Sequence, residues 1–118
     1  MGCPVVHFEI GAKDGGKLAG FYAKLFDWKT MPYGPASMID TGTKEGIMGH
    51  VNQLGHEPHN YCVVYIGVDD IGKYVKQAEK AGAKLIVPAT EVPGMGHFAW
   101  MTDPEGNYFG LWKAAKQG

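Results

Sequence analysis

Two stretches of the chain nearly repeat each other: IGAKDGGK at residues 10–17 and IGVDDIGK at residues 66–73. At a shift of 56 residues, Ile, Gly, Asp, Gly and Lys recur in register. A repeat of this kind indicates that one structural unit has been duplicated within the chain. We therefore expect a fold made of two similar halves.

Each copy lies between a predicted strand and a predicted helix. Apolar runs precede the copies, PVVHFEI at 4–10 and YCVVYI at 61–66, and such runs are typical of strands. Helical spacing follows each copy, with Asp14 and Asp70 placed to cap the two helices and Gly82 placed to end the second. The apolar residues of the first helix are Leu18, Phe21, Tyr22, Leu25 and Phe26, and those of the second are Ile71, Tyr74, Val75, Ala78 and Ala81.

Three short extended runs follow each helix, so each half reads β-α-β-β-β. A second correspondence pairs IMGHV at 47–51 with YFGLW at 108–112 at a shift of 61 residues. It places Gly49 on Gly110 and gives the second half about five extra residues.

The two repeats then cover about 4–52 and 60–113. A unit of under about 60 residues buries little apolar surface on its own, so the two halves have to share a core. We expect one α+β domain spanning residues 1–118.

Three motifs, HFEI at 7–10, FYAKLFDW at 21–28 and DPEGNYFGLW at 103–112, resemble the vicinal oxygen chelate superfamily. This superfamily includes glyoxalase I, the bleomycin-resistance proteins and the extradiol dioxygenases. The resemblance runs over residues 4–113. It implies that the duplicated βαβββ units form a mixed sheet curled into a cup, and that the chain forms a homodimer or pairs with a partner chain.

The resemblance also implies four metal ligands, one each on the first, fourth, fifth and eighth strands. Carried over to this chain, these positions fall on His7, Gly49, Val63 and Gly110, and only His7 has a donor atom. Because a divalent metal takes four or more donors, we expect no catalytic metal and no cofactor. If Gly49 faces the cup, strand alternation sends His50 to the opposite face, away from the cup. The alternative is a non-standard Zn, Ni, Mn or Fe site built with His50, His56, His59 or His97.

His7 and Glu9 point to the same face of their strand, because side chains alternate along it. The glycines at the lost ligand positions leave space, so we expect a pocket that suits a planar or apolar small molecule. Aromatic side chains are expected to line it: Tyr65, Phe98, Trp100, Tyr108 and Trp112. In the alternative interpretation these aromatics only fill the core, and His7 only hydrogen-bonds its neighbours.

Three functions follow from these residues. The first is metal-independent binding of a small, partly aromatic or apolar molecule, as the resistance proteins of the superfamily do. The second is a lyase or isomerase in which Glu9 and His7 transfer a proton. The third is a structural or regulatory module with a vestigial pocket. A true glyoxalase I is disfavoured, because its chemistry requires the metal.

The composition sets further limits. The chain has 118 residues and a formal charge of −1, so we expect no nucleic-acid partner and no anionic membrane partner. It has no apolar run of roughly 20 residues that could span a bilayer and no signal-peptide pattern. Cys3 and Cys62 lie in or beside apolar runs, and we expect buried free thiols in a reducing cytoplasm.

Overall fold

The structure is a computed structural model, and it describes residues 2–53 and 61–115. The chain divides into two compact units, His7–Val63 and Met1–Val6 with Val64–Gly118. These units correspond closely to the two predicted halves, and each is described separately below.

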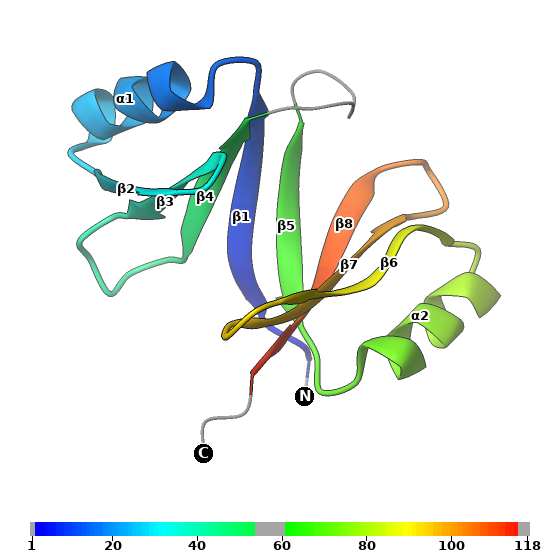
Figure 1. The fold of residues 1–118 in the computed structure, drawn as a ribbon. Coiled ribbons are helices and arrows are strands. Elements are labelled where there is room, and N and C mark those ends of the chain that lie inside the picture. The colour runs from blue at the N-terminus through cyan, green and yellow to red at the C-terminus, as the bar shows by residue number, and fades with distance from the viewer. Residues whose placement is uncertain (1, 54–60, 116–118) are drawn as a thin grey trace. The chain divides into compact units, whose positions relative to one another are not determined.

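The first half contains one helix and four paired strands (Figure 1). The strand order is β2-β3-β4-β1, in which β1 and β4 are parallel and the other pairs are antiparallel. The elements are β1 (Val5–Ala12), α1 (Gly15–Phe26), β2 (Lys29–Tyr33), β3 (Ala36–Asp40) and β4 (Met48–Gln53).

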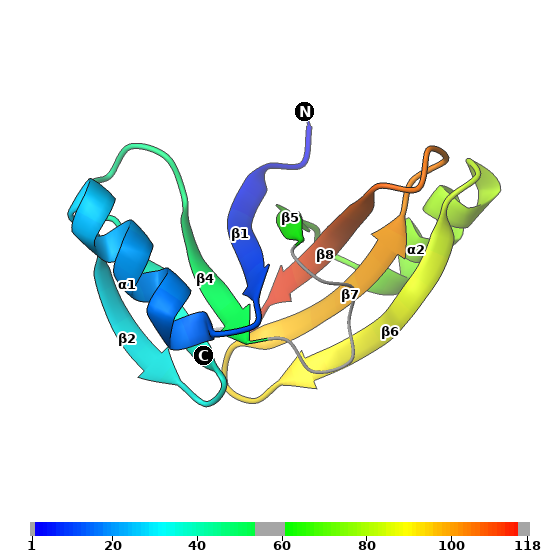
Figure 2. The same ribbon diagram turned by 90° about the horizontal axis from the view of Figure 1, so that it is seen from above.

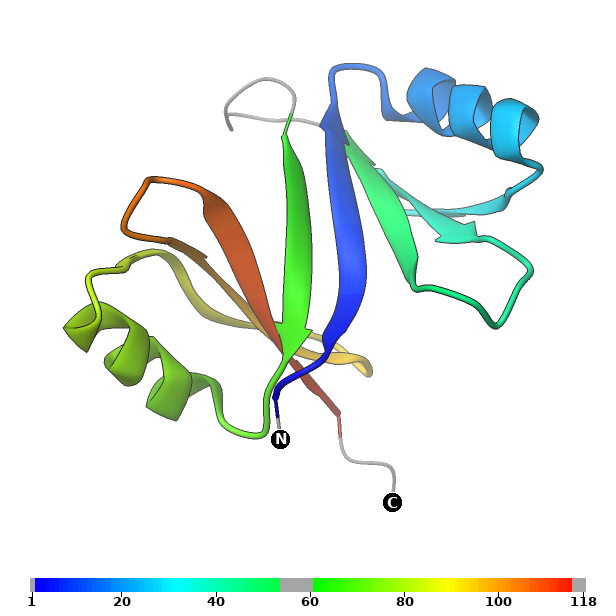
Figure 3. The same cartoon turned by 180° about the vertical axis from the view of Figure 1, so that it is seen from behind.

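The second half repeats this arrangement (Figure 3). Its strand order is β5-β8-β7-β6, with β5 and β8 parallel and the other pairs antiparallel. The predicted α+β fold of two βαβββ units is therefore confirmed. The elements are β5 (Cys62–Gly67), α2 (Ile71–Lys80), β6 (Lys84–Val92), β7 (Gly96–Thr102) and β8 (Tyr108–Ala114).

Both helices begin at the predicted capping residues. An Asp14 carboxylate oxygen accepts from the Lys17 backbone N–H at 3.0 Å, and Asp70 accepts from Lys73 at 3.0 Å. Each bond satisfies a backbone donor that the first helical turn leaves without a partner. Gly82 follows α2 with a φ of +105°, a conformation that favours glycine.

Each helix packs on one face of its own sheet, as Figure 2 shows for α1 over the strands of the first half. In the first half the packed face carries Ala12, Ile39 and Val51, which lie against Ala19 of α1. In the second half it carries Ala99, Met101 and Leu111, which lie against Ile71 of α2. Because side chains alternate along a strand, the residues between these positions point to the opposite face.

The expected burial of the two thiols is wrong. Cys3 and Cys62 are both free, as expected, but both are exposed. Cys3 precedes β1, and Cys62 begins β5 one position before the buried Val63. Among residues 2–53 and 61–115, no helix is long and apolar enough to cross a membrane.

Gly49 lies on the helix-packed face of β4, directly against Phe8. A Cβ at this position would come within 2.5 Å of the Phe8 carbonyl oxygen and 2.6 Å of its ring. Gly20, in the interior of α1, would meet nothing within 4 Å. The two glycines therefore provide a matched pair for testing which face Gly49 occupies.

We expect Gly49→Ala to lower the free energy of unfolding by about 1–3 kcal/mol, because the added methyl group meets a backbone atom that cannot turn aside. Gly20→Ala should raise it by about 0.5–1 kcal/mol, because alanine is the better helix former. Urea unfolding of both variants measures the difference. Changes of the same sign and size would contradict this placement of Gly49.

Candidate functional site

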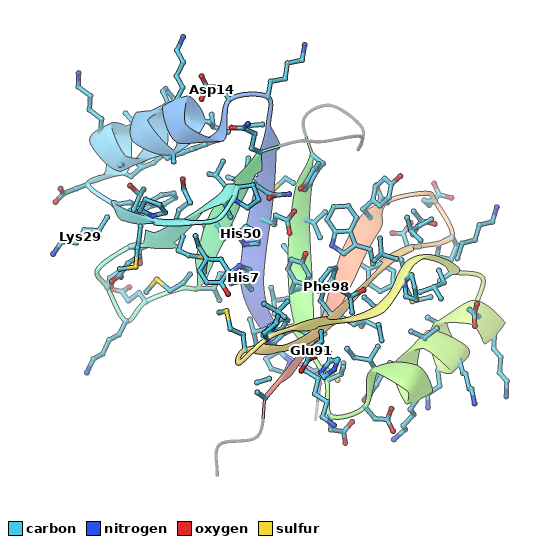
Figure 4. The ribbon with its side chains drawn as sticks, viewed as in Figure 1. His7, Asp14, Lys29, His50, Glu91 and Phe98 are labelled. Carbon is cyan, nitrogen blue, oxygen red and sulfur yellow. The ribbon has the colours of Figure 1, made fainter. Side chains whose placement is uncertain are left out.

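The face of the first-half sheet opposite α1 brings three ionisable side chains together. His7 and Glu9 lie two residues apart on β1, and Glu9 is the register partner of His50 on β4. Register partners on adjacent strands point to the same face of a sheet, so all three side chains lie on one face. Figure 4 shows the labelled His7 and His50 next to each other on these two strands.

Hydrogen bonds link the three side chains in a row, from His7 through His50 to Glu9. The His7 Nε2 and His50 Nδ1 atoms are 2.7 Å apart, and His50 Nε2 is 3.2 Å from Glu9 Oε1. The Tyr61 hydroxyl donates to Glu9 Oε2, and Asn52 Nδ2 lies 3.3 Å from the Tyr61 oxygen. We call His7, His50, Glu9 and Tyr61 the polar chain.

Glu9 is a buried carboxyl, with 5% of its surface exposed. Its two oxygens have different partners, an imidazole on Oε1 and a phenol on Oε2. Buried charges are tolerated when they are paired and hydrogen-bonded in this way. Glu9 and His7 lie on the same face of β1 as predicted, and the hydrogen-bond partners of Glu9 are His50 and Tyr61.

The chemistry of the groups limits where the protons lie. An ionised carboxylate only accepts hydrogen bonds, so His50 donates to Glu9 from Nε2. A neutral His50 accepts from His7 at Nδ1, and a protonated His50 donates to His7 through the same atom. His50 therefore uses both of its ring nitrogens, and it links the Glu9 carboxyl to the His7 imidazole.

The pKa of His7 is lowered from 6.5 to about 4. Burial is the largest cause, because it disfavours the charged imidazolium, and the neighbouring His50 lowers the pKa further. The Glu9 carboxylate raises the pKa of His7, but by less than burial and His50 lower it. His7 is therefore a neutral imidazole near pH 7.

His50 was placed on the wrong face by the sequence alignment of the two halves. Glu9 corresponds to Tyr65 at the shift of 56 residues, and their register partners are His50 and Gly110. The last strands therefore align at a shift of 60, and not at the 61 that matched Gly49 to Gly110. The two cores packed against the helices support the same shift of 60, because the buried residues Val51 and Leu111 correspond at it.

The fourth-strand ligand position that the resemblance implies therefore falls on His50. Two of the four positions, His7 and His50, keep a donor atom, while Val63 and Gly110 do not. The sequence disfavours glyoxalase I chemistry on the ground that three ligand positions lack a donor atom. With only two such positions, that ground is weaker.

The donors as arranged do not fit the metal site that the resemblance implies. The facing nitrogens of His7 and His50 are at hydrogen-bond distance, and the other His50 nitrogen faces Glu9. Within residues 2–53 and 61–115, no three His, Cys, Asp or Glu side chains are grouped to hold a metal ion. His97 lies in the second half, between Glu91 and Lys113 of the neighbouring strands. His56 and His59 lie outside the described residues.

Methionines lie beside the polar chain on the same face of the sheet. Met48 is the register partner of His7, Met38 that of His50, and Met31 that of Met38. Met31 is 69% exposed and Met48 is 36% exposed. Methionine is flexible and polarisable and adapts to varied apolar partners, so this face combines polar groups with an adaptable apolar surface.

The predicted aromatic residues share one face of the second-half sheet. The register pairs Phe98 with Trp112 and Trp100 with Gly110, and Figure 4 labels Phe98 in this half. The Trp100 ring N–H donates to the Tyr65 hydroxyl at 2.7 Å, and both residues are buried. The Tyr108 ring lies 5.8 Å from that of Trp100, centroid to centroid.

The space expected over the two glycines is filled. A Cβ on Gly110 would lie 2.3 Å from the Tyr65 ring, and Phe8 covers Gly49 in the same way. The described cavities lie elsewhere in the second half and border none of the residues that were expected to line the pocket. One of about 270 Å³ borders Glu91, His97 and Lys113, and one of about 370 Å³ borders Cys3 and Tyr74.

A sequence model of the glyoxalase-like domain matches residues 6–112, so this chain belongs to the glyoxalase-like domain family. It is 28% identical to the anthracycline biosynthesis protein DnrV of Streptomyces peucetius over 124 residues, 90% of this chain and 45% of the relative. It is 36% identical to the putative glyoxylase CFP32 of Mycobacterium bovis over 58 residues, 49% of this chain and 22% of the relative. The chain thus spans less than half the length of these curated relatives.

Solved structures show the same fold. The Mn(II)-bound glyoxalase from Novosphingobium aromaticivorans aligns with a TM-score of 0.68 and 19% identity, over 97% of this chain and 41% of that chain. The hypothetical protein BH1468 from Bacillus halodurans aligns with a TM-score of 0.72 and 12% identity, over 100% and 99%. At these identities the likeness shows the vicinal oxygen chelate fold alone.

The lowered pKa of His7 predicts a pH dependence of stability. Between pH 6.5 and about 4 the unfolded chain binds a proton at this residue that the folded chain does not, so stability falls as the pH drops through this window. We expect His7→Gln to flatten that slope, measured by urea unfolding at several pH values. The exposed His97→Gln is the control, and equal slopes in wild type and His7→Gln would contradict the assignment.

Proposed function

We propose that this glyoxalase-like protein binds a small organic molecule with a planar or apolar body, and that binding needs no catalytic metal. The observation that carries the proposal is the polar chain beside Met31, Met38 and Met48 on one face of the sheet. Ligand sites typically combine an apolar surface with a few fixed polar groups. The aromatic face of the second half is a further surface of suitable chemistry.

The relatives support a ring-containing ligand. Two Streptomyces relatives are named for anthracycline biosynthesis, and anthracyclines are built on fused rings with hydroxyl substituents. Methionine side chains pack against ring faces and edges, and an imidazole or carboxyl binds a hydroxyl group. We propose an aromatic compound with polar substituents as the ligand class.

We further propose that residues 1–118 form one domain, in a cytoplasmic protein that assembles as a homodimer. The match over residues 6–112 covers both halves as one family unit. Cys3 and Cys62 are free and exposed, and a reducing compartment keeps such thiols reduced.

The polar chain also favours a second candidate function, a lyase or isomerase that moves a proton on its substrate. A ligand C–H or O–H proton would pass to the Glu9 carboxylate or the His7 imidazole, with both groups held in place by hydrogen bonds to His50. General acid–base catalysis requires a group with this positioning.

We expect metal-free protein to bind fused-ring aromatic compounds, including an anthracycline, in isothermal titration calorimetry with EDTA present. His50→Ala should weaken binding by roughly 10-fold or more, because a partner of both Glu9 and His7 is removed. His97→Ala, in the other half, should leave the affinity unchanged.

Two results would oppose the binding proposal. One is stoichiometric metal in the purified protein that His7→Ala abolishes, together with binding that EDTA removes. The other is equal weakening by His50→Ala and His97→Ala, which would separate binding from the polar chain.

For the proton-transfer function, compounds found to bind are incubated with the protein in D₂O, and NMR follows loss of ligand C–H signals. We expect exchange that Glu9→Gln reduces at least roughly 100-fold while the affinity stays within a few-fold, because the amide keeps the shape but not the basicity. Exchange that survives in Glu9→Gln would remove Glu9 from the reaction.

A further inference from the structure

We propose that the second half has a binding site of its own, between α2 and the sheet, for a small molecule with one aromatic ring and a polar substituent. The site is the cavity of about 370 Å³ that borders Cys3 and Tyr74. It lies on the helix side of the second half, whereas the polar chain lies on the opposite face of the first half. The inference therefore does not depend on the function proposed above.

The cavity is large enough for a ring and has a mostly apolar lining. Its apolar side chains come from β5, β8 and α2: Ile66, Phe109, Leu111 and Ala78. An apolar cavity of about 150 Å³ is already large enough to hold benzene, so this one has room for a ring and its substituents. Sites for small molecules typically combine such a lining with a few polar groups.

In the first half, aromatic rings fill the space beside α1 and its sheet. Tyr22 of α1 stacks on Trp28 at 5.8 Å between ring centroids, with 18° between the ring planes. Trp28 in turn lies 6.1 Å from the Phe8 ring, and both of these residues pack against the core of the first half. Stacked rings of this kind are a stable way to fill an apolar space.

The second half has small side chains where α1 and its end supply two of these rings. Tyr22 and Ala78 lie at the same distance along their helices from the capping aspartates. Trp28 and Ala83 each directly follow the residue of positive φ that comes after the helix. Two alanines therefore stand in the second half where the first half has a tyrosine and a tryptophan.

The third ring is exchanged between strands and not lost. Phe8 corresponds to Val64 at the shift of 56, and Gly49 corresponds to Phe109 at the shift of 60. The ring that β1 supplies in the first half is therefore supplied by β8 in the second. Ala78, by contrast, borders the cavity directly. The cavity thus lies where the first half has the Tyr22 ring, and the first half indicates what it accommodates, the ring of a phenol.

Tyr74 supplies a polar group at the cavity. The Cys3 thiol donates to the Tyr74 hydroxyl oxygen at 3.3 Å, so the Tyr74 O–H is directed to another acceptor. Tyr74 is half-buried and borders the cavity. A ligand with its ring in the cavity and an oxygen beside Tyr74 would accept this hydrogen bond. The geometry therefore favours a phenol-like ligand over a purely apolar one.

p-Cresol, which is the side chain of tyrosine as a free molecule, is the probe for this site. We expect saturable shifts of the Ile66 and Leu111 methyl signals in ¹H–¹³C NMR of the full chain. Ala78→Tyr should weaken binding at least roughly 10-fold, because its ring takes the place of the probe. Glu79→Tyr adds the same ring at the next, exposed position of α2 and should bind as wild type does. Circular dichroism verifies that each variant is folded.

Tyr74→Phe provides a second measurement that preserves the packing, because it removes only a hydroxyl group. It should weaken p-cresol binding at least about 3-fold and leave the affinity for toluene unchanged, since toluene accepts no hydrogen bond at this position.

Three results would overturn the inference. The first is the absence of saturable shifts at Ile66 and Leu111 in wild type. The second is p-cresol shifts confined to the methyl groups of Met31 and Met48, which would assign the probe to the site beside the polar chain. The third is equal binding by wild type and a folded Ala78→Tyr. Equal weakening of p-cresol and toluene by Tyr74→Phe would overturn the role of the hydroxyl.

Discussion

The parallel pairing of β1 with β4 is the constraint on which the candidate site depends. This register sets Glu9 beside His50, and strand alternation then places His7 on the same face. A slip of one residue would turn His50 toward α1 and separate the three groups. Phe8 against Gly49 holds the register from the other side, because only glycine leaves room for the ring. Packing on the helix side of the sheet thus determines which side chains meet on the opposite face.

The two halves have the same backbone plan but different chemistry. At equivalent positions the first half carries Glu9 and His50 where the second carries Tyr65 and Gly110. One face therefore holds a hydrogen-bonded set of ionisable groups, and the other a set of aromatic rings joined by the bond between Trp100 and Tyr65. Duplication followed by divergence at the positions opposite each helix explains how one fold carries two kinds of surface. We propose that ligand binding depends on this difference between the ionisable face of the first half and the aromatic face of the second.

Much of the fold could be predicted from the sequence because its signals are local. The repeat, the helix caps at Asp14 and Asp70 and the shared face of His7 and Glu9 need only neighbouring residues. The role of His50 depends on strand pairing, which no local pattern encodes. Matching Gly49 to Gly110 relied on residue identity, and the error of one position reversed the face. Tyr61 and Asn52 were missed for the same reason, since their contacts cross from one strand or segment to another.

The central claim is that His50 joins Glu9 to His7 through both of its ring nitrogens. Long-range ¹H–¹⁵N NMR of the histidine rings at neutral pH observes this directly, since it identifies which nitrogen carries the proton. The account predicts a proton on His50 Nε2, and its signal should change in Glu9→Gln. A His50 ring protonated only on Nδ1, or one whose signals do not respond to Glu9→Gln, would contradict it.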